Sequence, residues 1–214
     1  MFPFPFSFFG AAAEPPELEL IDNDFAMEFN GTDEYISAGN PTELQFTSSF
    51  SISGWFKSSS ATNQRIVSKD DGTNRSYLVQ LQSNGVVRGT VFKSGSGQNN
   101  DSSSGFADGD WHHFVFTFEN GVGTKLYIDN GTPTVNASAN AVDNDPSIFT
   151  IGTRGDGLNY FNGDIDEVAV WNKVLDATDV ATIYNATNDN SGKCANLWSG
   201  GLGTGLVYWN RMGD

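Results

Sequence analysis

Cysteine and histidine are nearly absent from this chain of 214 residues, which contains one cysteine and two histidines. With Cys194 alone, no intrachain disulfide can form, and no Cys/His cluster offers the ligands of a zinc site. His112 and His113 are adjacent, so on a strand their side chains point to opposite faces and cannot hold one ion together. The sequence therefore excludes a disulfide scaffold and a zinc site.

Basic residues are also scarce, since 11 Lys and Arg stand against 26 Asp and Glu, for a formal net charge of −15. No stretch of sequence gathers Lys and Arg to neutralise phosphates, so nucleic acid is excluded as a partner. No apolar run approaches the roughly 20 residues of a transmembrane helix, and we expect no membrane insertion. Residues 1–13 resemble a secretion signal only superficially, because they lack a basic region and contain two prolines.

The chain is rich in residues that form short strands and turns. Seventeen Phe, six Tyr and five Trp supply bulky strand residues, and 24 Gly supply turns together with Asn, Asp, Ser and Thr. Four turn sequences, at 70–72, 84–85, 120–121 and 129–131, are typical of hairpins. The runs that predict strands are 25–29, 35–37, 50–57, 64–69, 76–82, 86–92, 111–119, 124–128, 148–151 and 163–171. This pattern predicts an all-β fold made of two antiparallel sheets.

Three segments allow more detailed predictions. In the run 111–119, three Phe share one face with His112, and we expect this face to lie in the core. The segment 176–185 is the one clear helix candidate, capped by Asp176, and is expected to cover the sandwich. The Gly/Ser/Asn stretch 94–105 is predicted to be a flexible loop.

The chain divides into three parts by composition. A Phe/Pro-rich N-terminal arm spans 1–17, a jelly-roll domain spans 18–189, and an aromatic and Gly-rich segment spans 190–214. The arm cannot be a stable helix, and its apolar side chains must dock on a partner subunit or on the sandwich itself. The side chains expected to anchor the arm are Phe2, Phe4, Phe6, Phe8 and Phe9.

Seven sequence motifs support the prediction of a sandwich. They occupy residues 27–36, 50–57, 66–69, 110–115, 126–131, 151–152 and 160–175. In this order they resemble the laminin-G-like jelly rolls of the concanavalin-A-like lectin and glucanase superfamily, and they span about residues 25 to 186. The ending at 206–214 is similar to a tail that follows such domains in phage and marine viral structural proteins.

Glucanases of this superfamily carry two glutamates flanking an aspartate at alternate positions of a strand. Asp164 and Asp166 share a face here, but position 168, where the next carboxylate would stand, is Val168. The resemblance therefore implies a protein that is not an enzyme.

Relatives of this kind hold a structural Ca²⁺ with the aspartate that matches Asp166. The resemblance implies Ca²⁺ as a cofactor, with Asp166 and Asp33 as candidate ligands. The alternative is that Asp166 caps or hydrogen-bonds a neighbouring loop.

The resemblance places Trp55, Trp111 and Trp171 in regular strands, and we expect all three in the core. For a glycan ligand, the candidate contact residues are Tyr160, Asn159 and Asp156, with Tyr160 as the stacking ring. The alternative for Tyr160 is a plain residue at the edge of the sheet.

These observations predict a non-catalytic structural and adhesive module associated with a virion, as a capsid decoration or a tail component. Its expected partners are protein subunits of a particle, in a homo-oligomer or with capsid and tail proteins, together with surface glycans. The alternative is a free, lectin-like carbohydrate-binding domain of a secreted or cell-surface protein.

Overall fold

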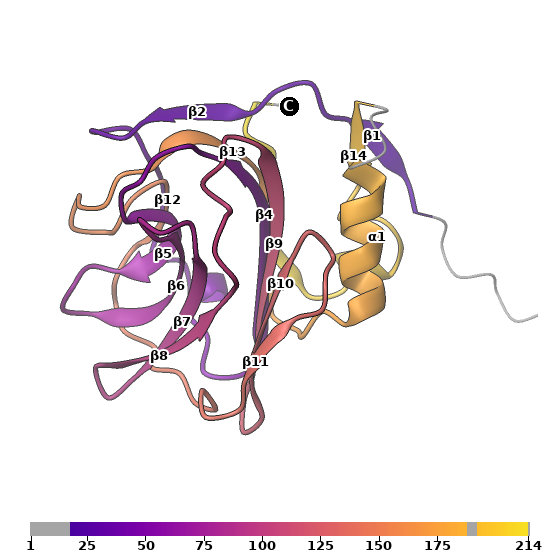
Figure 1. Ribbon diagram of the computed structural model, residues 1–214. Coiled ribbons are helices and arrows are strands. Elements are labelled where there is room, and N and C mark those ends of the chain that lie inside the picture. Colours follow the sequence, from indigo (N-terminus) through magenta and orange to yellow (C-terminus); the bar gives the residue numbers. More distant parts are fainter. Residues whose placement is uncertain (1–17, 188–191, 214) are drawn as a thin grey trace, which may run out of the picture.

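Two antiparallel sheets that face each other form the body of the protein (Figure 1). The structure, a computed structural model, describes residues 18–187 and 192–213. It confirms the predicted all-β jelly-roll sandwich with one late helix. The predicted assembly arm at 1–17 lies outside the described residues.

The strands of each sheet are given in spatial order. The six-stranded sheet contains β3 (Ile36–Gly39), β12 (Phe149–Ile151), β5 (Gln64–Asp70), β6 (Arg75–Leu81), β7 (Val87–Lys93) and β8 (Ser96–Asp101). In the seven-stranded sheet the spatial order is β11 (Thr134–Asn136), β10 (Gly123–Ile128), β9 (Trp111–Glu119), β4 (Phe50–Lys57), β13 (Asn162–Trp171) and β15 (Leu206–Asn210), and β2 (Met27–Asn30) also pairs with β13. A separate pair joins β1 (Leu20–Asp22) to β14 (Lys193–Ala195), and short 3-10 helices span Thr42–Leu44 and Gly200–Gly203.

Strand β13 organises the seven-stranded sheet because three strands pair with it. Strand β4 lies along one side, while β2 and β15 lie end to end along the other, with Met27 opposite Ile165 and Asn210 opposite Val168. The register with β4 shifts between Asp166 and Ala169, and the backbone of the intervening Glu167 has φ 51°. Ile165 and Val168 both point into the core, so this bulge places two consecutive carboxylates, those of Asp166 and Glu167, on the outer face.

The main core fills the space between the two sheets. The three Phe of β9 are fully buried there, which confirms the face predicted for this strand. Phe116 packs against the backbone of β7 so closely that a Cβ at Gly89 would collide with its ring. Glycine at this position is therefore required by the packing of the two sheets.

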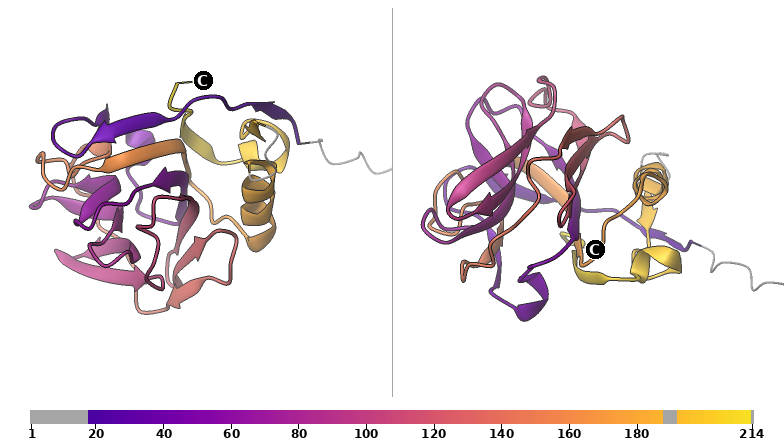
Figure 2. Two further views of the ribbon diagram at one scale, coloured as in Figure 1. Left: turned by 45° about the horizontal axis from the view of Figure 1, so that its top comes forward. Right: turned by 90° about the horizontal axis from the view of Figure 1, so that it is seen from below.

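A second apolar cluster lies on the outer face of the seven-stranded sheet. Helix α1 (Ala177–Thr187) covers this face, as both views of Figure 2 show. Val115 and Trp171 from the sheet are buried beneath Val180 of the helix. Asp176 caps the helix, since its Oδ1 accepts hydrogen bonds from the amides of Thr178 at 2.8 Å and Asp179 at 2.9 Å. The prediction of a capped helix that covers the sandwich is confirmed.

The prediction of a flexible loop at 94–105 is wrong, because this stretch contains strand β8. Its residues have low strand propensity, but side-chain contacts with the opposite sheet hold the edge. The amide of Asn100 donates to the carbonyl oxygens of Thr124 at 3.2 Å and Thr134 at 3.1 Å. Tertiary context therefore overrides local propensity here.

In the part of the chain that the structure describes, the helices are too short and too polar to cross a membrane.

Candidate functional site

A cleft of about 410 Å³ opens on the outer face of the seven-stranded sheet, beyond the end of helix α1. Five elements build it: the linker between β1 and β2, the strands β4, β9 and β13, and the last turn of the helix. The residues that line it are Asn23, Asp24, Phe25, Ala26, Trp55, Trp111, Asp166 and Thr187.

Aromatic rings form much of the wall of the cleft. Phe25 is 63% exposed and Trp111 is 39% exposed. The prediction that Trp111 lies in the core is wrong, because helix α1 does not cover this end of β9. The same prediction is confirmed for Trp55 and Trp171, which are buried. Trp55 is held rigidly, since its ring stacks on that of Tyr184 at 5.6 Å with an interplanar angle of 13°.

Two polar atoms of the cleft residues are buried without a hydrogen-bond partner among the described residues. They are the indole Nε1 of Trp55, a donor, and the amide Oδ1 of Asn23, an acceptor. The Nδ2 of Asn23 donates to Asp166 Oδ2 at 3.1 Å, which fixes the orientation of the amide. Because unpaired buried polar groups are costly, these two atoms are suited to hydrogen bonds with a ligand.

The structure does not bring the two predicted metal ligands together. Asp166 is 6% exposed and accepts hydrogen bonds from Asn23 and from the amide of Glu167 at 2.8 Å. Asp33 lies in the turn after β2 and accepts a hydrogen bond from Asn30. Asn30 is paired with Asn162 of β13, which is four residues before Asp166 along that strand, so Asp33 and Asp166 are well separated. Across residues 18–187 and 192–213, no three His, Cys, Asp or Glu side chains group closely enough to hold a metal.

The carboxylates of β13 are each engaged in contacts within the protein. Asp164 and Asp166 share the outer face as predicted, and Asp164 lies 3.4 Å from Lys57 Nζ. Burial raises the pKa of Glu167, which accepts a hydrogen bond from Trp209 Nε1 at 2.7 Å. Glu167 therefore links β13 to the C-terminal strand.

The predicted glycan-contacting residues lie in a loop on the opposite side of the sandwich. Tyr160 is half-buried and its ring centroid is 6.4 Å from that of Tyr35. Asp156 accepts two hydrogen bonds from Arg154, at 2.7 and 2.6 Å. The amide of Asn159 donates to a backbone oxygen 3.3 Å away in the segment before β5.

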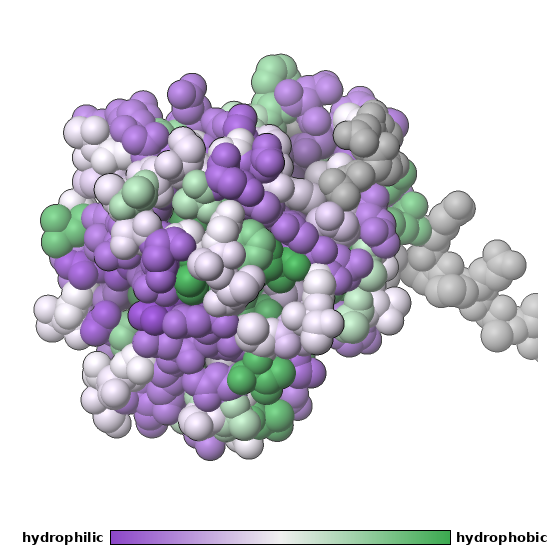
Figure 3. All heavy atoms as spheres, in the orientation of Figure 1, coloured by the Kyte–Doolittle hydropathy of each residue, from purple (hydrophilic) through white to green (hydrophobic). Residues whose placement is uncertain are grey.

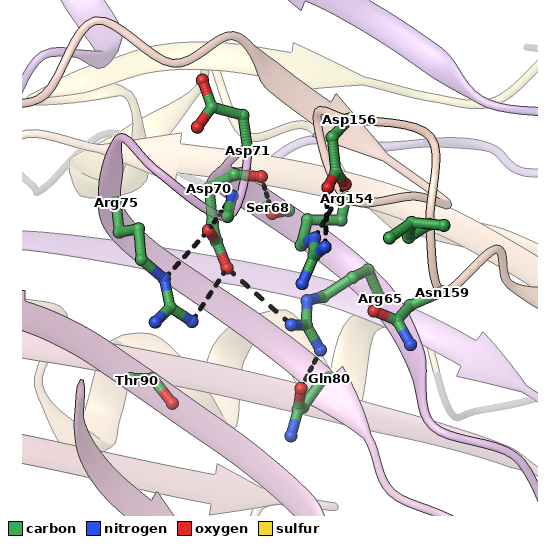
Figure 4. A network of polar contacts seen from close by, with 12 residues as sticks. Arg65, Ser68, Asp70, Asp71, Arg75, Gln80, Thr90, Arg154, Asp156 and Asn159 are labelled. Carbon is green, nitrogen blue, oxygen red and sulfur yellow. Dashed lines mark hydrogen bonds and ion pairs between the residues drawn. The ribbon is translucent and has the colours of Figure 1, made fainter. Parts of the chain in front are cut away.

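This loop adjoins a polar network on the outer face of the six-stranded sheet (Figure 4). Its centre is Asp70, which is fully buried and accepts hydrogen bonds from Arg75 at 3.1 and 3.4 Å. Arg65 lies 3.7 Å from the same carboxylate and also donates to Gln80. Burial lowers the pKa of Arg65 to about 10.

The two histidines have opposite environments, as their alternation on β9 predicts. His112 lies between two carboxylates, with Nδ1 2.7 Å from Asp129 and Nε2 3.1 Å from Asp108. His113 is buried beneath the helix beside Trp55. Burial lowers the pKa of His113 to about 3, whereas the hydrogen bond with Asp129 raises that of His112.

Apolar side chains on the visible face of the molecule form several small, separate groups between polar ones (Figure 3). Sequence reasoning identified Asp166 but missed Asn23, which lies in a linker without a strand pattern. It placed Phe25 at the start of the predicted strand 25–29, whereas the observed strand β2 begins at Met27 and leaves Phe25 in the linker. The signal that could have found both residues is a polar pair followed by an aromatic residue, at 23–25.

A family model described as the concanavalin A-like lectin/glucanases superfamily, of laminin G type, matches residues 30–181. Adhesion G-protein coupled receptor V1 of Danio rerio is 26% identical over 178 residues, which cover 72% of this chain and 3% of the receptor. The chain therefore spans a small fraction of that relative.

Solved structures share the fold at low sequence identity. A Bacteroides ovatus protein described as a candidate carbohydrate-binding protein matches with a TM-score of 0.66 and 18% identity, over 91% of this chain and 53% of that one. The binding domain of botulinum neurotoxin DC, solved in complex with SialylT, matches with a TM-score of 0.60 and 15% identity, over 79% and 46%. A heptameric SAP-like pentraxin of Limulus polyphemus matches with a TM-score of 0.53 and 14% identity, over 76% and 82%. With its family motifs and its two-sheet sandwich, the chain belongs to the concanavalin A-like lectin/glucanase superfamily.

Proposed function

We propose that this protein is a non-catalytic, lectin-like module that binds carbohydrate in the cleft beyond the end of helix α1. The observation that carries the proposal is the combination of exposed aromatic rings, from Phe25 and Trp111, with an unpaired donor on Trp55 and an unpaired acceptor on Asn23. A sugar presents both kinds of surface, since its C–H face stacks on rings and its hydroxyls donate and accept hydrogen bonds.

The geometry also supports a binding role over a catalytic one. Retaining glycosidases need two carboxylates about 5 Å apart that are available to the substrate. On β13, Asp164 is paired with Lys57 and Glu167 is held by Trp209. The two similar structures described as carbohydrate-binding or solved with a glycan support a carbohydrate ligand.

The test is a glycan array followed by titration calorimetry with the glycans it identifies. Substituting Trp111→Ala removes a stacking surface and should weaken binding by up to about tenfold, the effect of losing one aromatic contact. Trp198→Ala is the matched control, because Trp198 is 61% exposed and does not line the cleft. Equal affinities for the two variants would show that the cleft is not the sugar site.

Calcium is proposed at the same end of β13. Asp166 and Asp24 both line the cleft and offer carboxylate oxygens, the ligands that Ca²⁺ prefers. A bound ion would fasten the linker between β1 and β2 to the sheet. Calorimetric titration of chelator-treated protein with millimolar CaCl₂ should show binding that Asp166→Asn removes and Asp33→Asn retains. An absence of heat and of any rise in Tm would remove calcium from the proposal.

The proposed setting is a virion, with the module as a capsid decoration or tail component among other protein subunits. The ending at 206–214 and the Phe/Pro-rich arm at 1–17 support this setting. The name of the zebrafish relative, an adhesion receptor, supports the alternative of an extracellular or cell-surface module. Gold-labelled antibody with electron microscopy of native particles distinguishes the two. A chain lacking residues 1–16 should fail to assemble if the arm is an anchor.

A further inference from the structure

The fold gathers arginines that are scattered along the sequence. Of the five arginines in a chain with a formal net charge of −15, Arg65, Arg75 and Arg88 belong to β5, β6 and β7, and Arg154 follows β12. All four lie on or beside the outer face of the six-stranded sheet. The fifth, Arg211, contacts Glu167 of the other sheet. An otherwise acidic protein therefore concentrates its guanidinium groups on one surface.

Arg65 is the least satisfied member of this group. Its side chain is 8% exposed, and its Nε is buried without a partner among the described residues. Its contact with Asp70, at 3.7 Å, is long because Arg75 already takes both oxygens of that carboxylate. Figure 4 shows the guanidinium group of Arg154 beside that of Arg65, and their repulsion contributes to the lowered pKa of Arg65.

Three guanidinium groups thus share two directly bonded carboxylates, those of Asp70 and Asp156. The neighbouring carboxylate of Asp71 does not pair with these arginines. It accepts hydrogen bonds from the backbone amides of Thr73 and Asn74 in the turn between β5 and β6. The three guanidinium groups therefore have one directly bonded carboxylate fewer than a one-to-one pairing would give.

Asp156 is the carboxylate most easily replaced. Its side chain is 31% exposed and its partner, Arg154, is only two residues away in a loop that contains Gly155 and Gly157. An exposed ion pair of this kind contributes little to stability, so its loss does not threaten the fold. Arg154, freed from Asp156, would present a planar fork of N–H donors to a ligand.

We propose that this surface is a second binding site, which takes the sulfate or carboxylate group of an acidic sugar, and that Asp156 occupies the place of that group when no ligand is bound. The ligand oxyanion replaces the Asp156 carboxylate on Arg154. Asn159 and Gln80 flank the site and can hydrogen-bond the hydroxyls of the sugar. The site is independent of the cleft on the other sheet.

The rest of the molecule makes such binding specific. With a net charge of −15, the protein as a whole repels polyanions, so general electrostatic attraction cannot account for association. At about 0.15 M salt the repulsion is screened beyond roughly 8 Å, which leaves short-range contacts to decide the outcome.

The experiment measures binding of dextran sulfate, polygalacturonate and neutral dextran to the full chain in 0.15 M NaCl. Arg154→Gln should abolish binding of the charged polymers, and Asp156→Ala should tighten it about tenfold, since it removes the internal competitor. The preferred polymer identifies the oxyanion as sulfate or carboxylate. Neutral dextran should not bind at this site.

Asp101→Ala is the matched control, because it also removes one negative charge and frees an arginine, Arg88, on the same face. If Asp101→Ala tightens binding as much as Asp156→Ala, the effect is general charge and the proposal fails. It also fails if neither charged polymer binds the Asp156→Ala variant. Trp111→Ala in the cleft should leave polyanion binding unchanged, which separates this site from the proposed lectin site.

Discussion

The two sheets of the sandwich differ most on their outer faces. The seven-stranded sheet carries a second apolar layer, in which Trp171 is fully buried under helix α1. On the six-stranded sheet, the corresponding face is lined by arginines and aspartates paired across β5, β6, β7 and β8. One face gains stability from burial of apolar area, whereas the other must satisfy each charge with a partner. The outer face of the seven-stranded sheet is therefore apolar under helix α1 and forms a cleft beyond the end of that helix. The outer face of the six-stranded sheet stays polar.

The largest effect is expected from opening the apolar layer. Trp171→Ala removes a fully buried ring and the hydrogen bond from its Nε1 to the carbonyl of Leu202 at 2.8 Å. The free energy of unfolding should fall by about 4 kcal/mol, as for other buried aromatic truncations. Urea denaturation measures it, and a loss below about 1 kcal/mol would mean that the helix layer is not a true core.

On the polar face, the largest loss of stability is expected from substituting the buried Asp70. Asp70→Asn leaves Arg65 and Arg75 without their shared negative charge, and we expect a loss of about 3 kcal/mol. The double variant Asp70→Leu with Arg65→Met should recover part of the loss, because it removes the buried charge of Arg65, whereas Arg75, whose side chain is 30% exposed, can be hydrated. Denaturation curves of the three proteins test this. No recovery would show that the loss comes from Arg75, which keeps its charge without a partner in both variants.

The covered face should also be sensitive to acid. His113 has a pKa of about 3 when folded and about 6.5 when unfolded, so the unfolded state takes up a proton first as pH falls below 6.5. Between pH 7 and 5 this should cost about 2 kcal/mol of stability. His113→Phe removes the titrating group and should flatten this part of the pH profile. An unchanged slope would place the acid sensitivity elsewhere.

The contribution of His112 to stability should change with pH in the opposite direction to that of His113. Its pKa is raised by the hydrogen bond with Asp129, so its contribution is fully present below about pH 6.5 and is lost as pH rises through the folded value. His112→Asn should therefore reduce stability at pH 6 more than at pH 9. Equal losses at both values would show that the contact does not depend on charge.

The smallest effect is expected at the exposed edge of the polar face. Arg88 and Asp101 form two hydrogen bonds of 2.6 Å, but both side chains are partly exposed and the pair is screened by water and salt. Arg88→Gln should cost less than about 1 kcal/mol, and the loss should shrink further in 1 M NaCl. A loss as large as that of Asp70→Asn would remove the distinction between buried and exposed pairs.

The strands could be predicted where local pattern and tertiary role agree. The predicted strands 50–57 and 111–119 have the same bounds as β4 and β9. Both runs are rich in bulky residues, which are buried in the observed strands. Strand β8 could not be predicted, since Ser96–Asp101 lacks strand formers and depends on contacts made by Asn100 with the other sheet. Its order comes from pairing with β7 together with contacts to residues more than twenty positions away.

The candidate sites were less accessible from the sequence. Asp166 was identified, but the bulge that turns Glu167 to the same face depends on how β13 pairs with β4. The arginine cluster was invisible because its members are separated along the chain and meet only when the strands pair. Proximity of this kind is set by register, which a single sequence does not display.

The end-to-end arrangement of β2 and β15 along β13 has a mechanical consequence. Together they occupy the place of one interrupted strand. The chain enters β2 at Met27 and leaves β15 at Asn210, and both points lie near the bulge. A force applied at Met27 and Asn210 acts on the adjoining ends of β2 and β15. The hydrogen bonds to β13 then break one pair at a time, starting at the bulge, and are not all sheared at once. A tether that joins this module to its surroundings through both points would therefore open by peeling, at low force, while the remaining strands of the sandwich stay paired.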